Sequence, residues 1–124
     1  MPFIAQEQAP SFELHGASFT GLASPSRGSS ENAVWIVSLP PGQQGVTHRL
    51  TREEIFVALE GRARAQVGPD SLDVTEGSCL VVPAGLDFSL TNDGVEAFRA
   101  VAVLPVGGQA SVGGGPAFTP PWAA

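Results

Sequence analysis

Short runs of β-branched and aromatic residues, separated by glycine and proline turns, are the feature that most constrains the fold of this chain. Residues 32–39 (NAVWIVSL) end at a Pro-Pro-Gly turn, and residues 79–82 (CLVV) end at a Pro-Ala-Gly turn. Residues 54–60 and 62–67 flank Gly61 as the two arms of a hairpin would. No stretch keeps a sustained helical period. The pattern predicts an all-β domain built from many short strands.

The composition divides the 124 residues into three parts. We expect an N-terminal arm over residues 1–11, the β-domain over residues 12–105 and a Gly/Pro-rich tail over residues 106–124. Phe118 and Trp122 would be poor choices for a wholly disordered tail, because each carries a large apolar surface. We therefore expect these two residues to anchor the tail on the domain or across a dimer.

The charge and the cysteine content of the chain limit its expected cellular compartment and its classes of binding partner. The net charge of −6, with six scattered arginines and no lysine, argues against a nucleic-acid or anionic-membrane surface. Cys79 lies in an apolar run, which predicts a buried, inert thiol. A single cysteine cannot form an internal disulfide, and residues 1–10 carry no signal-peptide pattern, so a cytoplasmic location is the expectation. No apolar run approaches the ~20 residues that cross a membrane.

Two segments contain polar residues at intervals that match a known pair of motifs. In the first, Glu54 stands six positions after His48 and is followed by six residues and then Gly61. In the second, GSCLVVPAGLDFSLTN, five residues separate the first glycine from the proline, and Phe88 stands four positions before the asparagine. The turn glycines, the proline and both spacings resemble the paired motifs of the cupin superfamily. The resemblance covers about residues 12 to 105.

This resemblance implies a small double-stranded β-helix (jelly-roll) barrel, usually dimeric, with a site inside one mouth of the barrel. In metal-bearing members three histidines and one glutamate converge there on a divalent ion. When the ligand positions of the cupin motif are mapped onto this sequence, the first histidine corresponds to His48 and the glutamate to Glu54. The other two histidine positions hold Leu50 and Phe88, whose side chains have no lone pair to offer a metal.

The remaining residues predict an apolar pocket with two polar groups. His48 and Leu50 are two apart on a strand and so point to the same face. We expect His48 and Glu54 to face a wall of substrate-binding side chains, namely Leu50, Phe56, Phe88 and Leu90. Two protein ligands would hold a metal only weakly. We therefore expect no tightly bound metal. His48 and Glu54 would be the ligands of any weakly bound divalent ion, unless Gln43, Gln44, Thr47 or His15 completed the shell.

The charge of Glu54 is the main chemical question that the sequence raises. A carboxylate among apolar side chains is costly without a partner, and His48 is the nearest plausible one. Such a pair would be either a structural contact or an acid/base dyad, with Glu54 as the base and His48 as the acid or electrophile.

Three functions follow from these residues, and the sequence leaves open whether the protein is an enzyme. The first is a homodimeric small-molecule-binding protein without a metal, acting as a sensor, carrier or accessory protein. The alternative is a metal-independent isomerase, cyclase or lyase that uses the His48–Glu54 dyad. A metal-dependent dioxygenase with a reduced ligand set is disfavoured, because Leu50 and Phe88 replace two metal ligands.

Overall fold

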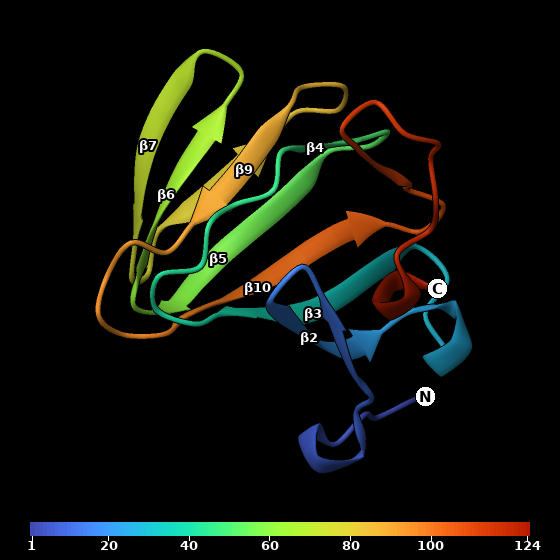
Figure 1. Ribbon diagram of the computed structural model, residues 1–124. Coiled ribbons are helices and arrows are strands. Elements are labelled where there is room, and N and C mark those ends of the chain that lie inside the picture. The colour runs from blue at the N-terminus through green and yellow to red at the C-terminus, as the bar shows by residue number, and fades with distance from the viewer.

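The computed structural model describes residues 1–124 and consists of two antiparallel sheets that face each other (Figure 1). Across the first sheet, the six strands in spatial order are β1 (Ser11–Leu14), β2 (Ala17–Ala23), β3 (Asn32–Leu39), β10 (Phe98–Pro105), β5 (Glu54–Glu60) and β8 (Cys79–Val82). Across the second, the five strands are β11 (Ala110–Val112), β4 (His48–Leu50), β9 (Phe88–Thr91), β6 (Arg62–Val67) and β7 (Asp70–Thr75). Three short 3-10 helices are η1 (Gln6–Gln8), η2 (Pro25–Arg27) and η3 (Pro121–Ala123). The prediction of an all-β domain is confirmed.

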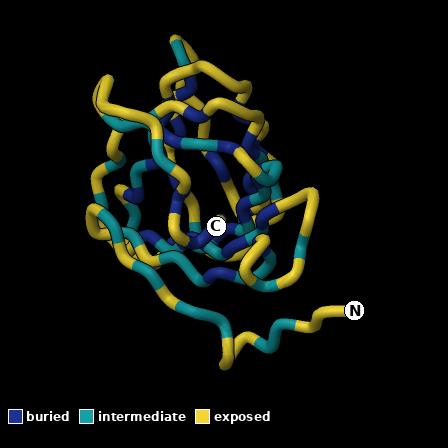
Figure 2. Tube along the Cα trace, turned by 90° about the vertical axis from the view of Figure 1, so that its right-hand side faces the viewer, coloured by how far each residue is buried: buried dark blue, intermediate teal, exposed yellow.

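The core lies between the sheets because the strands alternate buried and exposed side chains. Along β3, Trp35, Val37 and Leu39 point inward and are at most 5% exposed, while the residues between them are only partly buried. The same alternation runs through β10 and β6. Figure 2 shows buried stretches in dark blue interspersed with lighter ones along the chain. Period-two burial of this kind fixes which side chains can reach the space between the sheets.

Most strand bounds agree with the sequence patterns, and the differences have local causes. The predicted strand over residues 32–39 is β3, and the break expected at Gly16 separates β1 from β2. His15 and Gly16 make that turn with positive φ angles of 52° and 85°. The prediction that Cys79 is buried is wrong, because its side chain is exposed. On β8 the residues that point inward are Leu80 and Val82, so Cys79 faces outward by alternation.

The C-terminal segment is packed against the barrel. Its strand β11 pairs with β4, and Phe118 forms a β-bridge with Ala110. Trp122 stacks face to face on Phe19 of β2, with ring centroids 3.6 Å apart, and the Nη2 of Arg27 donates a hydrogen bond of 2.9 Å to the Trp122 carbonyl. The expectation that the two aromatic residues anchor this segment on the domain is confirmed. Figure 1 shows the segment in red beside the early strands in blue.

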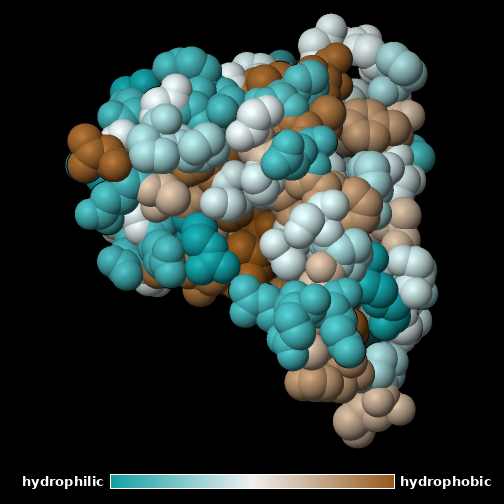
Figure 3. All heavy atoms as spheres, turned by 60° about the horizontal axis from the view of Figure 1, so that its bottom comes forward, coloured by the Kyte–Doolittle hydropathy of each residue, from teal (hydrophilic) through white to brown (hydrophobic).

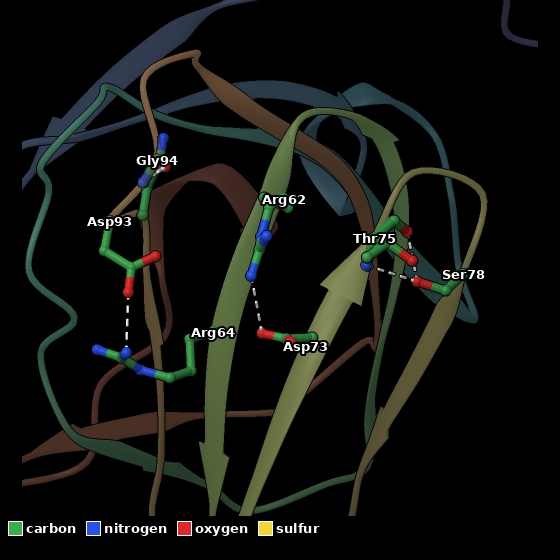
Figure 4. A network of polar contacts seen from close by, with 8 residues as sticks. Arg62, Arg64, Asp73, Thr75, Ser78, Asp93 and Gly94 are labelled. Carbon is green, nitrogen blue, oxygen red and sulfur yellow. Dashed lines mark hydrogen bonds and ion pairs between the residues drawn. The ribbon is translucent and has the colours of Figure 1, made fainter.

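The arginines of the sheets form ion pairs on the outside of the barrel. Arg62 lies 3.3 Å from Asp73, and Arg64 lies 2.8 Å from Asp93 (Figure 4). Beside them, the Ser78 hydroxyl accepts from the Thr75 amide and donates to the Thr75 carbonyl. On the first sheet, Arg99 pairs with Glu60 at 3.2 Å. Exposed pairs of this kind contribute little to stability, and these three guanidinium groups point away from the core.

The helices of this structure are short 3-10 turns, and none of them has the length and apolar character of a membrane-spanning helix.

Candidate ligand-binding site

A cavity of about 130 Å³ lies between the two sheets and is lined mainly by hydrophobic side chains. Trp35 of β3 and Phe56 of β5 form part of one wall, and Leu90 of β9 faces them from the second sheet. Phe118 and Trp122 of the C-terminal segment complete the lining. The volume is close to the roughly 150 Å³ that accommodates one benzene ring in an apolar protein cavity. In the view of Figure 3, apolar atoms in brown come to the surface among hydrophilic ones.

Glu54 is the only acidic residue in the lining of this cavity. It begins β5, is paired in register with Val82 of β8 and points inward on the same side as Phe56. The side chain is 4% exposed, and its Oε1 has no hydrogen-bond partner. Burial disfavours the charged form and raises the pKa of the Glu54 carboxyl to about 8. The carboxyl group is therefore mostly protonated at neutral pH.

His48 is the second polar motif residue in the lining, which also contains His15, Gln43 and Gln44. It lies on β4, in register with Phe88 of β9 on one side and Val112 of β11 on the other. Its Nδ1 is 2.8 Å from the carbonyl oxygen of Val46. Because a carbonyl only accepts, Nδ1 carries the hydrogen, and the lone pair of the neutral ring is on Nε2. Burial lowers the pKa of His48, and the hydrogen bond to Val46 opposes this shift without cancelling it.

His48 and Glu54 line the same cavity but do not hydrogen-bond to each other. The expected hydrogen-bonded pair is therefore absent: His48 bonds to the Val46 carbonyl through Nδ1, and the Glu54 carboxyl has no partner at Oε1. The directions of the two pKa shifts also reverse the expected roles. A protonated Glu54 is an acid and a neutral His48 is a base.

The predicted wall residues divide into three that line the cavity and one that does not. Leu50, Phe56 and Leu90 are in the lining. Phe88 is 1% exposed and lies outside the lining, because the His48 ring packs against it with centroids 4.1 Å apart. Trp35 of β3 is both buried and part of the lining.

Several lining residues come from segments that the motifs do not include. Those from the first two strands and the C-terminal segment include Leu14, Phe19, Val112, Phe118, Pro120 and Trp122. The large apolar surfaces of Phe118 and Trp122 were the only signal in the sequence that this segment is packed. Nothing in the sequence indicated where the two rings would dock.

The residues around His48 and Glu54 do not fit the metal centre of metal-bearing relatives. No group of three or more His, Cys, Asp or Glu side chains is arranged to hold a metal ion. Among the residues considered for completing a metal shell, Gln43 uses its amide nitrogen to donate to the carbonyls of His15 and Gln44. Thr47 is exposed and outside the lining. His15 and Gln44 also line the cavity, but His15 does not join His48 and Glu54 in a group that could hold a metal ion. The motif positions themselves supply one imidazole and one carboxyl group, fewer than a structural or catalytic metal site uses.

Comparison with known proteins decides the family. The model of the cupin domain matches residues 35–104, which include both motif segments and most of the barrel. The chain is a cupin. Its two facing antiparallel sheets form the jelly-roll barrel that the motifs imply. Auxin-binding protein 5 of Zea mays is 31% identical over 70 residues, which are 56% of this cupin and 47% of that protein. The match thus spans about half the length of that relative.

Solved structures share the same fold at low sequence identity. The polyketide cyclase RemF from Streptomyces resistomycificus superposes with a TM-score of 0.77 at 14% identity, covering 98% of this cupin and 88% of that chain. An RmlC-like cupin from Shewanella frigidimarina superposes with a TM-score of 0.70 at 16% identity, covering 83% and 88%. At these identities the likeness shows the fold alone.

Proposed function

We propose that this cupin binds a small, largely apolar molecule in the cavity around His48 and Glu54, and that it does so without a resident metal. The observation that carries the proposal is an apolar cavity that contains a buried carboxyl group with no partner at Oε1. Apolar walls with a few polar groups are the usual composition of small-molecule sites. A molecule in this cavity would remove the aromatic walls from water and give the Glu54 carboxyl a hydrogen bond.

The test is a screen of small ring compounds by two-dimensional NMR of the isotopically labelled chain. The indole N–H signals of Trp35 and Trp122 report on the cavity, because both side chains line it. Binders should shift these two signals before others. Val112→Trp is the matched variant that fills the site, because Val112 lines the cavity beside His48. If the compounds bind but move signals remote from the cavity in both proteins, the ligand site lies elsewhere.

Metal-independent proton transfer is the second candidate function, and the pKa directions favour it. A carboxyl with its pKa near 8 can donate a proton at neutral pH, and a neutral imidazole can accept one. This division of roles suits an isomerase, cyclase or lyase, the alternative that the sequence left open. Structural neighbours include the polyketide cyclase and a protein described as DMSP lyase DddQ from Ruegeria pomeroyi.

Solvent exchange tests proton transfer without knowledge of the natural substrate. Carbonyl compounds that the NMR screen retains would be incubated with the protein in deuterated water, and deuterium at the carbon next to the carbonyl would be measured by mass spectrometry. Catalysed exchange should disappear in Glu54→Gln and His48→Gln while binding persists. Exchange at the uncatalysed rate with every bound carbonyl compound would reject this second function.

We also propose that the protein is a homodimer formed through the outer face of the first sheet. Two rows of apolar side chains cross that face in register: Val34, Val103, Ile55 and Val81 in one row, and Ile36, Val101, Val57 and Cys79 in the other. Val57 and Val81 are 38% and 49% exposed. A second copy is the partner that fits, because a twofold axis would lay these uncharged rows on each other, as in sheet-on-sheet packing.

Light scattering coupled to size-exclusion chromatography tests the dimer. Val81→Glu places a charge inside the apolar rows and should give a monomer. Val95→Glu is the control, because Val95 is 93% exposed and lies outside the rows. It should leave the dimer intact. A wild-type protein that elutes as a monomer at high concentration contradicts the proposal.

A further inference from the structure

Two buried side-chain atoms of this protein have no hydrogen-bond partner, Oε1 of Glu54 and Nε1 of Trp122. Both residues line the same cavity. Folded proteins seldom leave buried polar atoms unpaired, because each one forfeits its hydrogen bond to water without gaining another. Because both residues line one apolar cavity, a molecule bound there is the candidate partner for both atoms.

The chemistry of the two atoms defines what the molecule must carry. The indole N–H of Trp122 can only donate, so it needs an acceptor such as a carbonyl or ether oxygen. The Glu54 carboxyl accepts in either protonation state, so a hydroxyl or N–H donor suits it. His48 adds a further acceptor, because its Nδ1 already donates to Val46 and only Nε2 is free.

The charge of the cavity lining excludes acidic ligands. The lining contains no arginine, and the protein has no lysine. Arg49, Arg62, Arg64 and Arg99 are held in ion pairs with surface carboxylates. Arg27 donates to the backbone carbonyls of Leu22 and Trp122, and Arg52 lies outside the lining. An anion in this cavity would lose its hydration beside a carboxyl group and apolar walls, with no arginine or lysine in the lining to compensate.

We infer that the ligand is an uncharged, single-ring-sized molecule with two polar ends, a hydrogen-bond acceptor for Trp122 and a hydrogen-bond donor for Glu54. This inference rests on the proposed small-molecule function and specifies its ligand class. A hydroxyl-bearing aromatic ketone is the simplest compound with that pattern. The remainder of such a molecule is apolar and matches the aromatic walls.

Isothermal titration with four ring compounds of similar size tests the inference. The first is 4-hydroxyacetophenone, with both polar ends. The second is 4-ethylphenol, which lacks the carbonyl, and the third is 4-methylacetophenone, which lacks the hydroxyl. The fourth, 4-hydroxybenzoate, is an anion. Because each new hydrogen bond satisfies an orphaned atom, losing either polar end should weaken binding about ten-fold, and the anion should bind most weakly.

Variants assign each loss to its atom. Trp122→Phe removes the N–H and keeps an aromatic ring in the lining, so it should weaken binding of 4-hydroxyacetophenone about ten-fold more than binding of 4-ethylphenol. Glu54→Leu should likewise weaken binding of 4-hydroxyacetophenone more than binding of 4-methylacetophenone, which has no hydroxyl to lose. Saturable binding of the one-ended compound also shows that each variant is folded. If a variant does not fold, the relative affinities of the four compounds for the wild-type protein still test the inferred ligand class.

The outcomes separate this inference from the function on which it rests. Equal affinity for the two-ended compound and its one-ended analogues overturns the inference and leaves the apolar pocket standing. Tighter binding of the anion overturns it as well. Failure of all four compounds to bind anywhere in the cavity would count against the proposed small-molecule function itself.

Discussion

The ring of His48 lies on the ring of Phe88, with centroids 4.1 Å apart, and the two residues are register partners on β4 and β9. Phe88 stands where the cupin motif has a metal-binding histidine. An aromatic ring thus packs against the one histidine that this chain retains from the motif. With Leu50 at the other position, two sites that hold metal-binding histidines in the cupin motif carry apolar side chains here.

Restoring the two histidines should create a metal site. In Leu50→His with Phe88→His, two imidazoles would join His48 and Glu54, because Leu50 is on the same face of β4 and Phe88 is opposite His48. Near-stoichiometric cobalt or zinc after dialysis, measured by elemental analysis, is the expected result, against little metal in the wild type. Leu72→His with Leu86→His adds two exposed histidines as the control. A folded double variant without metal would show that positions 50 and 88 do not converge.

Glu54 should make the protein less stable as pH rises. Its pKa is near 4.5 when unfolded and about 8 when folded, so the folded state holds the proton more tightly. The stabilisation is complete below the unfolded pKa and is lost as the pH rises through the folded pKa. The free energy of unfolding should fall by up to about 1.4 kcal/mol per pH unit in between.

Chemical denaturation from about pH 5 to about pH 8.5 measures this slope. Glu54→Gln mimics the protonated carboxyl and should flatten the profile. Glu53→Gln, at the exposed neighbouring position, should keep the wild-type slope. Identical slopes in all three proteins would mean that Glu54 ionises freely in the fold.

His48 should titrate below the ordinary histidine range and carry its hydrogen on Nδ1. Burial lowers the pKa of His48, so the stability that it confers is present above the unfolded value of 6.5 and is lost as the pH falls. Nitrogen NMR of the imidazole reports the tautomer and the midpoint, and His15→Gln assigns the remaining signal. A midpoint above 6.5 would indicate a carboxylate partner that the structure does not show.

Trp122 should stabilise the barrel through its ring rather than through its N–H. Trp122→Ala leaves a cavity beside Phe19 and should cost about 3 to 5 kcal/mol. Trp122→Phe should cost less, because the indole nitrogen has no hydrogen bond to lose in the ligand-free protein. Thermal denaturation of both variants checks this order. Equal losses would mean that the indole nitrogen has a partner in solution.

Motif spacing predicted the barrel and placed His48, Leu50 and Glu54 on its inner side. That inference worked because strand alternation has a period of two and leaves one choice of face once a motif position is fixed. The same reasoning misplaced Cys79, because a continuous apolar run does not show which of its residues face solvent on an edge strand.

Two aspects of the site depend on long-range packing that no local pattern encodes. The pKa values of Glu54 and His48 follow from the partners that each side chain lacks or finds, and these come from distant strands. The role of Trp122 in the lining depends on where a Gly/Pro-rich segment docks, and that segment has no periodicity from which its position could be inferred.

A crystal structure of the protein soaked with 4-hydroxyacetophenone would examine the ligand site itself. We expect the ring to lie between the two sheets, with its hydroxyl within hydrogen-bond distance of Glu54 and its carbonyl oxygen near Nε1 of Trp122. A metal ion coordinated by His48 and Glu54, or an empty cavity with the compound bound on the outer surface, would contradict a metal-free small-molecule site in this barrel.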